Sequence, residues 1–335
     1  MLSKLYARVA ARRRRWYEQH QDSRRRLSRP VISVGAISVG GSGKTPVAKF
    51  IAELLRDAGE YPAILSRGYG RAERTEGVVV VRDRNRVLAD FDVAGDEPRM
   101  LAEQLSDVCV LVGEDRYIAG HLAETQFGAT VHVLDDGFQH YALERDIDLL
   151  LLHQDDCAQR TLPSGRLRES IETARCADVV IVDAVDIATA DTIRERLQLE
   201  IVFRMERLLG NPLMIQGSSD STLIEEGARI LVVSGIAKPI QFTDALLGAG
   251  FNIVDTMFFK DHHRFTAADI RHIAKRNQSK SIDCVVTTEK DAVRFMPHAP
   301  LPFSLAVVPL AVQIQPANEF RSLLLNRLQT SGLEK

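Results

Sequence analysis

Short apolar runs alternate with stretches of helical periodicity along most of the chain. The first strands are expected at 31–34, 63–65, 78–81, 108–112, 131–134, 147–152 and 179–182. Helical patterns between them cover 45–58, 97–105, 115–126 and 188–197. Several of the runs are apolar throughout, which is typical of parallel strands covered on both faces. The alternation predicts a doubly wound α/β domain with a mostly parallel sheet.

A turn-rich polar stretch interrupts this pattern before a second alternation begins at 229. The elements predicted for this second alternation are 230–233, 238–249, 251–258, 266–277, 282–287 and 302–311, with a final helix at 317–329. We therefore expect a second, smaller α/β domain that closes over a cleft. The predicted division is a basic segment at 1–29, a main domain at 30–200, a linker at 201–228 and the smaller domain at 229–335.

The first twenty residues have the pattern of an amphipathic helix. Leu2, Leu5, Tyr6 and Val9 recur at helical spacing among arginines. Residues 1–29 hold ten basic and two acidic residues, a net charge of +8 in a chain of net charge −2. Such a helix is expected to bind an anionic membrane surface. A helix packed on its own domain, a nucleic-acid patch and a transit peptide are the alternatives.

The composition excludes several classes of protein. The 335 residues, 45% of them apolar, are enough for two globular domains. The four cysteines are widely separated, which predicts neither a zinc site nor a disulfide framework. No apolar run is long enough to cross a bilayer and no secretory signal is visible, so we expect a cytosolic protein that is not translocated.

A glycine-rich turn lies between the first predicted strand and the first predicted helix. It reads Val39-Gly40-Gly41-Ser42-Gly43-Lys44-Thr45-Pro46. Glycines let backbone N–H groups converge on phosphate oxygens, and the following helix directs its positive end at the same anion. In such a loop Lys44 reaches the β- and γ-phosphates, and the Thr45 hydroxyl binds Mg²⁺. The pattern predicts a P-loop NTPase-like domain that binds a nucleoside triphosphate.

This loop departs from the strict P-loop pattern at one position. Ser38 stands where the pattern has glycine, and the extra pair Gly40-Gly41 compensates. A glycine turn with a chance lysine is the alternative, which the flanking periodicity disfavours. The expected nucleotide-binding residues are Ser38, Val39, Gly40, Gly41, Ser42, Gly43, Lys44 and Thr45.

Two carboxylates, Asp135 and Asp136, end the strand predicted at 131–134. In P-loop proteins the aspartate that helps to hold Mg²⁺ lies at the carboxyl end of a core strand, beside the phosphates. Either residue fits this position. An acidic turn after a strand is the alternative.

Three further stretches hold candidate residues of less specific character. Arg168 suits a developing phosphoryl charge and Glu169 a metal, although such a stretch, taken alone, is more often a loop that leads into a charged helix. Asp96 has the position of a helix N-cap. His262 and the adjacent His263 lie in a turn, where exposed histidines are common. A kinase needs a base near its acceptor hydroxyl, and these stretches could supply one.

Taken together, these stretches resemble one family, the tetraacyldisaccharide 4′-kinases of lipid A biosynthesis. The resemblance covers nearly the whole chain and depends on the order and spacing of its motifs. Ala36 is a departure, since the family pattern has asparagine there. The motifs are the basic amphipathic start, residues 39–46, Ser66-Arg67-Gly68-Tyr69-Gly70, Gly95-Asp96-Glu97-Pro98, residues 135–140, residues 165–169, Asp261-His262-His263 and Thr288-Glu289-Lys290-Asp291.

The resemblance implies the reaction and the roles of matching residues. It implies transfer of the ATP γ-phosphate to the 4′-hydroxyl of an acylated glucosamine disaccharide 1-phosphate. The enzyme would lie peripherally at the cytoplasmic face of the bacterial inner membrane. The implied metal-binding residues are Thr45, Asp136 and Glu169, with the choice between Asp135 and Asp136 open. The implied catalytic residues are Lys44, Arg168 and Asp96, with His262 paired to Asp96 as the base.

Two other classes of function compete with this interpretation. A P-loop switch or metallochaperone would need a Cys/His cluster or a guanine-selecting Asn-Lys-x-Asp motif, and Thr288-Glu289-Lys290-Asp291 does not match that motif. This mismatch favours ATP. A nucleic-acid-binding ATPase would spread basic residues over a working surface, whereas the chain beyond residue 29 is acidic. We therefore expect no nucleic-acid partner.

Overall fold

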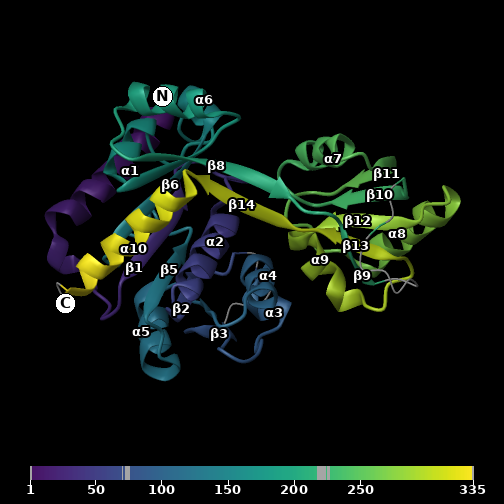
Figure 1. The fold of residues 1–335 in the computed structure, drawn as a ribbon, viewed down its shortest axis with the longest axis horizontal. Helices are drawn as coiled ribbons and strands as arrows, with labels where there is room; N and C mark the ends of the chain where they lie inside the picture. The colour runs from purple at the N-terminus through teal and green to yellow at the C-terminus, as the bar shows by residue number, and fades with distance from the viewer. Residues whose placement is uncertain (1, 70, 72–75, 217–223, 225–226, 334–335) are drawn as a thin grey trace. The chain divides into compact units, whose positions relative to one another are not determined.

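The computed structural model describes residues 2–69, 71, 76–216, 224 and 227–333 (Figure 1). Gly70 of the resemblance, and residues 217–223 and 225–226 of the predicted linker, lie outside the described residues. The chain divides into two compact units. Unit 1 comprises Met1–Arg207 and Val312–Lys335, and unit 2 comprises Leu208–Ala311.

Among the described residues, nine strands form the sheet of unit 1. They are β1 (Val31–Ala36), β2 (Pro62–Ser66), β3 (Val79–Arg82), β4 (Cys109–Val112), β5 (Val131–Asp135), β6 (Ile147–His153), β7 (Val179–Asp183), β8 (Val202–Leu209) and β14 (Leu310–Gln315). Their order is β14-β8-β7-β6-β1-β5-β2-β4-β3. The pairings from β8 to β4 are parallel and β3 is antiparallel to β4. The carboxyl ends of β1, β2, β4 and β5 therefore meet at one edge of the sheet, where parallel α/β folds bind ligands.

Helices cover both faces of this sheet. They are α1 (Leu2–Gln19), α2 (Lys44–Asp57), α3 (Phe91–Ala94), α4 (Asp96–Gln104), α5 (Arg116–Phe127), α6 (Ile187–Leu197) and α10 (Ala317–Leu333), with 3₁₀ turns η1 (Gln21–Ser23), η2 (Gln154–Ala158) and η3 (Ile171–Cys176). Apolar side chains of α2, α4 and α10 share one cluster with alternate strand residues such as Ile32 and Val34. Those of α5 and α6 pack on the residues that point the other way.

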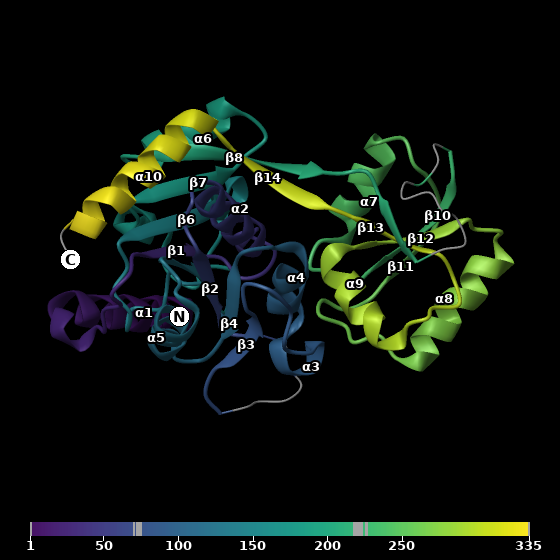
Figure 2. The same ribbon diagram turned by 60° about the horizontal axis from the view of Figure 1, so that its bottom comes forward.

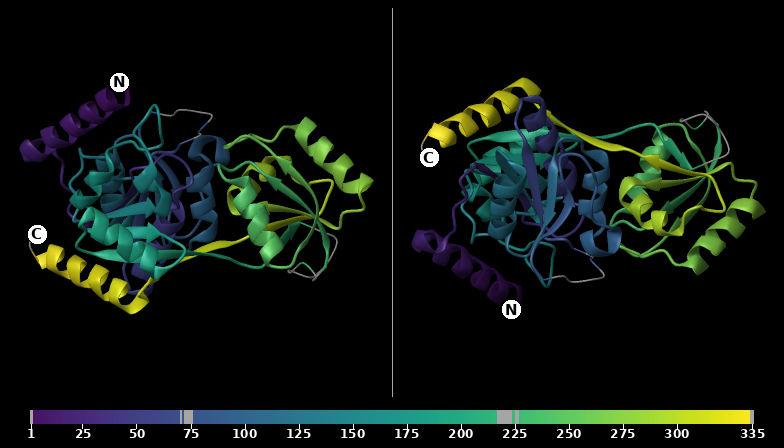
Figure 3. Two further views of the ribbon diagram at one scale, coloured as in Figure 1. Left: turned by 90° about the horizontal axis from the view of Figure 1, so that it is seen from above. Right: turned by 90° about the horizontal axis from the view of Figure 1, so that it is seen from below.

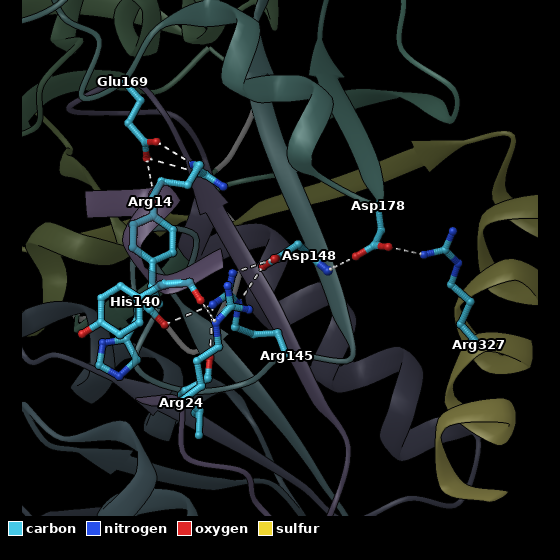
Figure 4. Close-up of polar contacts among 11 residues, drawn as sticks. Arg14, Arg24, His140, Arg145, Asp148, Glu169, Asp178 and Arg327 are labelled. Atoms are coloured by element: carbon cyan, nitrogen blue, oxygen red, sulfur yellow. Dashed lines mark hydrogen bonds and ion pairs between the residues drawn. The ribbon is translucent and has the colours of Figure 1, made fainter. Parts of the chain in front are cut away.

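The C-terminal helix α10 belongs to the core of unit 1. Phe320 is fully buried, and its ring centre lies 5.1 Å from that of Phe203 and 6.3 Å from that of Phe50. Arg327 donates to Asp178 at 2.8 Å (Figure 4). Figure 3 shows α10 and α1 on opposite sides of the large sheet. Helix α10 thus lies in the same layer as α2 and covers the same face of the sheet.

Unit 2 is a smaller α/β unit with its own core. Its strands are β9 (Leu213–Gln216), β10 (Arg229–Ser234), β11 (Asn252–Phe258), β12 (Cys284–Thr288) and β13 (Leu305–Val308). Its helices are α7 (Pro239–Gly248), α8 (Ala267–Ser279) and α9 (Glu289–Phe295), with the 3₁₀ turn η4 (Met296–His298). The order β11-β10-β12-β13-β9 is parallel except for β9. Thr266 begins α8 with a capping box to Asp269, as its sequence favours.

The predicted strands and helices are confirmed within a few residues, but the predicted boundaries of the smaller domain differ from the structure. Strand β8 lies in the segment taken as a linker, and β14 and α10 return to unit 1. β8 alternates buried Phe203 and Met205 with half-buried charged residues, so it has no apolar run. Figure 1 and Figure 2 show β8 and β14 side by side, as the strand order requires.

The close approach of Gly35 to Phe138 yields a stability prediction. A Cβ at Gly35 would lie 2.4 Å from Phe138 Cβ and 2.6 Å from its backbone nitrogen. Because backbone must move to make room, Gly35→Ala is expected to lower the free energy of unfolding by about 1–3 kcal/mol. Urea denaturation followed by circular dichroism measures this. Gly113→Ala is the control, since its nearest neighbour would lie 3.4 Å away; equal midpoints for the two variants would contradict the prediction.

Candidate active site

The phosphate loop connects β1 to α2. Gly40, Gly41 and Gly43 have φ angles of 74°, 57° and 84°, in the left-handed region that favours glycine. Helix α2 begins at Lys44, directly after the last of them. The first N–H groups of a helix have no partner within it and carry its positive dipole end. This segment therefore has the geometry of an anion-binding loop.

Two arginines hold the backbone of this loop through its carbonyl oxygens. Arg166 Nη2 donates to the carbonyl oxygens of Val39, at 2.8 Å, and Gly40, at 3.0 Å. Arg207 Nη2 donates to the carbonyl oxygen of Gly41 at 3.1 Å. A phosphate needs N–H donors, so bonds to carbonyl oxygens fix the loop without competing for that role.

Ser38 has a defined partner at the position where the strict pattern has glycine. Its buried hydroxyl donates to Asp156 Oδ2 at 3.1 Å. The same oxygen accepts from the backbone N–H of His153 at 2.9 Å. The hydroxyl thus ties the start of the loop to the turn after β6, which a glycine could not do.

Lys44 and Thr45 contact the two carboxylates that follow β5. Lys44 Nζ lies 3.0 Å from Ser42 Oγ and 3.7 Å from Asp136 Oδ1. Thr45 Oγ1 lies 3.4 and 3.3 Å from the two carboxylate oxygens of Asp135. The structure therefore brings together the phosphate loop and both candidate aspartates.

Asp135 is buried, and its environment disfavours a lone negative charge. Burial, followed by the nearby carboxylates of Glu97 and Asp136, raises the pKa of Asp135 to about 7. A divalent cation would reverse this effect because it favours the ionised form. The oxygen donors of Thr45 and Asp135 are those that Mg²⁺ prefers, so the residues present fit this ion.

Asp136 faces the arginine proposed from sequence. Arg168 Nη1 donates to both carboxylate oxygens of Asp136, at 2.9 and 3.0 Å, and lies 3.3 Å from Gln139 Oε1. Gln139 in turn donates to the carbonyl oxygen of Ala36 at 3.1 Å. Asp136 has a φ of 56°, an unfavourable conformation for a residue with a side chain and one found often at functional sites.

Glu169 has different partners from the other predicted metal-binding residues. Its oxygens accept from Arg14 Nε at 3.0 Å and from the Tyr141 hydroxyl at 2.8 Å. Among the described residues, no three His, Cys, Asp or Glu side chains gather in a group that could hold a metal. In this structure Glu169 is therefore paired with Arg14 and Tyr141, and its predicted metal role stays a prediction.

Asp96 is buried at the first position of α4. Gly95 before it has a φ of 87°, and a Cβ there would lie 2.7 Å from the carbonyl oxygen of Tyr69. The effect of Glu97 on the pKa of Asp135 shows that this helix begins close to the phosphate loop. Asp96 therefore lies on a helix whose first turn is near Asp135.

His262 lies in unit 2 among charged side chains. Lys290 Nζ is 3.0 Å from its Nε2, and Arg294 Nη2 is 3.4 Å from its Nδ1. Its φ of 59° is in the left-handed region. His263, by contrast, bonds to Asp269 at 3.1 Å and stacks on Phe259, so it has a packing role. The pairing of His262 with Asp96, which lies in unit 1, stays a prediction.

The contacts of three arginines near the phosphate loop and the aspartates, Arg166, Arg207 and Arg116, were not predicted from the sequence. Arg166 was noted only as part of a motif, and Arg207 lies in the segment taken as a linker. Arg116 is buried at the start of α5, where burial and then the neighbouring Arg67 lower its pKa to about 10. The attraction of Asp135 and Asp136 acts in the opposite direction. Spacing gave no signal for these residues, because their contacts arise between distant segments.

Comparison with known proteins identifies the family. The family described as "Tetraacyldisaccharide-1-P 4'-kinase" (LpxK) matches residues 1–329. The chain belongs to this family. A tetraacyldisaccharide 4′-kinase of Koribacter versatilis is 38% identical over 297 residues, 87% of this chain and 86% of the relative. That of Syntrophus aciditrophicus is 34% identical over 320 residues, 91% and 85% of the two chains.

A solved structure extends the match to the fold. The crystal structure of the "apo" form of LpxK from Aquifex aeolicus in complex with ATP has a TM-score of 0.77. It is 29% identical and covers 98% of this chain and 97% of its own. The predicted family, P-loop α/β fold class and kinase activity are thereby confirmed. The roles predicted for individual residues are not tested by these comparisons.

No helix among the described residues has the length and apolar character needed to cross a bilayer.

The hydrogen bond of Ser38 yields a prediction about the variant loop. Ser38→Gly restores the strict P-loop pattern but removes the bond to Asp156. Since a buried hydrogen bond is worth about 0.5–1.5 kcal/mol, binding of a nucleoside triphosphate is expected to weaken about 2- to 10-fold. Calorimetric titration measures it. Asp156→Ala should cause a similar loss with no further loss in the double variant; tighter binding by Ser38→Gly would refute the role of the hydroxyl.

Proposed function

We propose that this chain transfers the γ-phosphate of ATP to the 4′-hydroxyl of a tetraacylated glucosamine disaccharide 1-phosphate, forming the 1,4′-bisphosphate in lipid A biosynthesis. The observation that carries the proposal is the meeting of Lys44, Thr45 and Asp135 at a phosphate loop, in a chain matched by this kinase family over residues 1–329. ATP as the donor is supported by the A. aeolicus LpxK structure, which contains it.

The phosphate loop and its cations position the donor. Backbone N–H groups after Gly40 and the start of α2 bind the phosphates, and Lys44 reaches the β- and γ-phosphates. Arg168, which is bonded to Asp136 and Gln139 in the structure, also binds the transferred phosphoryl group as charge develops there, since a guanidinium can bind two oxygens at once. Positioning and charge stabilisation supply most of the catalysis of phosphoryl transfer.

Thr45 and Asp135 would hold Mg²⁺, with Asp136 as the further carboxylate near it. The bound ion would supply positive charge that neutralises the phosphates. The buried position of Asp135 and its raised pKa support its choice over Asp136 as the principal ligand. Asp136 is already bonded to Arg168, which suits a residue that holds the arginine in place.

Asp96 acts as the base for the acceptor hydroxyl. As the 4′-oxygen forms its bond to the γ-phosphorus, its proton passes to the Asp96 carboxylate and the bond to the departing ADP breaks. His262 pairs with Asp96 and is held for this purpose by Lys290 and Arg294. The pair would form only when the substrates are bound, which limits hydrolysis of ATP by water.

Helix α1 is proposed to bind the membrane that contains the acylated substrate. Leu2, Leu5 and Val9 are 68%, 59% and 62% exposed, and Trp16 is 45% exposed. Exposed apolar residues beside arginines suit the boundary between headgroups and acyl chains of an anionic leaflet. The enzyme would then lie peripherally on the cytoplasmic face of the bacterial inner membrane, where ATP is available, and nucleic acid has no part in this function.

The activity is tested by phosphoryl transfer from Mg-ATP to tetraacyldisaccharide 1-phosphate in mixed micelles. Wild type is expected to form the bisphosphate. Lys44→Ala removes a phosphate contact and Asp96→Asn removes the base, so each should lower kcat by roughly 100-fold or more. Lys49→Ala, on the same helix beyond the loop, is the control for Lys44. ATP hydrolysis without bisphosphate in the wild type would reject the proposal.

Membrane binding is tested with charged substitutions on the exposed face of α1. Leu5→Asp and Val9→Asp together remove two apolar side chains from the bilayer and add negative charge. Sedimentation with anionic vesicles is expected to weaken by tenfold or more, because each buried apolar side chain contributes about 1.5–3 kcal/mol. Ile187→Asp on α6, which is equally exposed at 60%, is the control. Equal sedimentation of all three proteins would disprove the role of α1.

A further inference from the structure

Among the described residues of α1, Arg14 is the one that is buried. Arg12 and Arg15 on the same helix are exposed. The guanidinium carbon of Arg14 lies 4.7 Å from the centre of the Phe138 ring and 4.8 Å from that of Tyr141. A cation over an aromatic face is favourable, more so when it is removed from water. Arg14 is therefore the side chain by which α1 enters the interior of unit 1.

The buried guanidinium forms a two-point ion pair with Glu169. Arg14 Nε donates to Oε2 at 3.0 Å and Nη2 donates to Oε1 at 3.4 Å (Figure 4). The Tyr141 hydroxyl donates to Oε1 at 2.8 Å. Arg14 is 9% exposed and Glu169 is 3% exposed. Since both charges are buried, loss of either partner leaves the other uncompensated and free to shift its segment.

Both segments held by Arg14 lead directly into the candidate active site. Glu169 follows Arg168, whose side chain is bonded to Asp136. Phe138 and Tyr141 follow Asp136 on the other segment. Arg14 thus contacts the residue that follows Arg168 and two rings on the segment that follows Asp136, from a helix outside the site.

The N-terminal end of α1 contacts the same loop as Arg14. Thr161 Oγ1 donates to the carbonyl oxygen of Ser3 at 3.0 Å, and the Ser3 hydroxyl donates to Ser164 Oγ at 2.8 Å. A cavity of about 460 Å³ lies between α1 and the segment 159–172. The helix is therefore joined to the loop at two points, of which only Arg14 is a buried ion pair adjoining Arg168.

We propose that Arg14 is a positioning residue for phosphoryl transfer, which couples the position of α1 to the alignment of Arg168 against Asp136. The inference rests on the proposed function and extends it. The helix that meets the lipid surface and the arginine that stabilises the transferred charge are linked by one buried ion pair. A shift of α1 reaches the site through Glu169 on one side and through the two aromatic rings on the other.

The chemistry of the pair requires arginine at position 14. A guanidinium presents two parallel donors that match a carboxylate and stacks on aromatic rings, whereas an ammonium is a single point charge. Arg14→Lys is therefore expected to keep the charge but only part of the alignment. A role limited to the net charge of α1 would make lysine equivalent to arginine.

A kinetic double-mutant cycle on the full-length protein tests this proposal. Arg14→Met, Glu169→Gln and the double variant are assayed with Mg-ATP and substrate in detergent micelles, which removes the dependence on vesicle binding. Because small misplacements at a reacting centre have large effects, kcat is expected to fall roughly tenfold in each single variant and by no more than that in the double. KM should change little, and Arg14→Lys should restore part of kcat. Arg321→Met, at an exposed arginine of α10 in the same unit, is the control and should leave kcat unchanged.

The outcomes of this cycle separate the proposal from its rivals. If Glu169 binds the metal directly, Glu169→Gln will raise the Mg²⁺ concentration needed for half-maximal rate while Arg14→Met will not, and the proposal fails. Full activity of Arg14→Met beside active wild type also overturns it, whereas inactive wild type argues against the proposed function instead. Thermal melts of each variant, with assays below the lowest midpoint, exclude unfolding as the cause.

A spectroscopic readout tests the coupling without reference to activity. Trp16, two residues after Arg14, is the single tryptophan of the chain. If α1 and the site are coupled, binding of Mg²⁺ and a non-hydrolysable ATP analogue should change its fluorescence in wild type, as reciprocity of coupled sites requires. Arg14→Met should abolish that change at saturating analogue. An equal change in Arg14→Met and wild type would overturn the proposal.

Discussion

Two adjacent carboxylates at the end of a buried strand are the constraint on which the site depends. Asp135 and Asp136 lie where β5 leaves the sheet, and like charges this close are stable only with positive charge around them. Lys44 and Arg168 supply part of that charge in the structure. A bound cation would supply the rest, so the electrostatic arrangement of these residues favours the Mg²⁺-nucleotide of a kinase.

Much of the fold and the centre of the site could be predicted from sequence, because both depend on local patterns. Apolar runs predicted β1 and β5. The glycines before Lys44 predicted the phosphate loop. The predictions failed where long-range pairing decides the outcome. β8 joins the sheet through an alternating, charged sequence that no apolar run reveals. The bond between Glu169 and Arg14, which are 155 positions apart, could not be predicted from spacing either.

The role of each arginine in this chain follows from its burial and its contacts, and not from the motif in which it lies. Those on the outer face of α1 remain exposed and suit an anionic surface. Arg166 and Arg207 bind carbonyl oxygens and shape the phosphate loop. Arg14 and Arg116 are buried, and each lies within reach of acidic residues of the site region. One residue type thus serves lipid binding, loop geometry and charge balance, and only its surroundings distinguish these roles.

The return of the C-terminal segment to unit 1 has a consequence for how the protein is made. Phe320 and Leu324 of α10 fill the core beside α2, yet they follow all of unit 2 in the chain and are synthesised after it. Domains usually fold as units during synthesis, beginning with the N-terminal one. Here the nucleotide-binding core cannot close until unit 2 has been synthesised. The nascent chain would therefore expose one face of its sheet until unit 2 has been synthesised, a period in which chaperones have access to it.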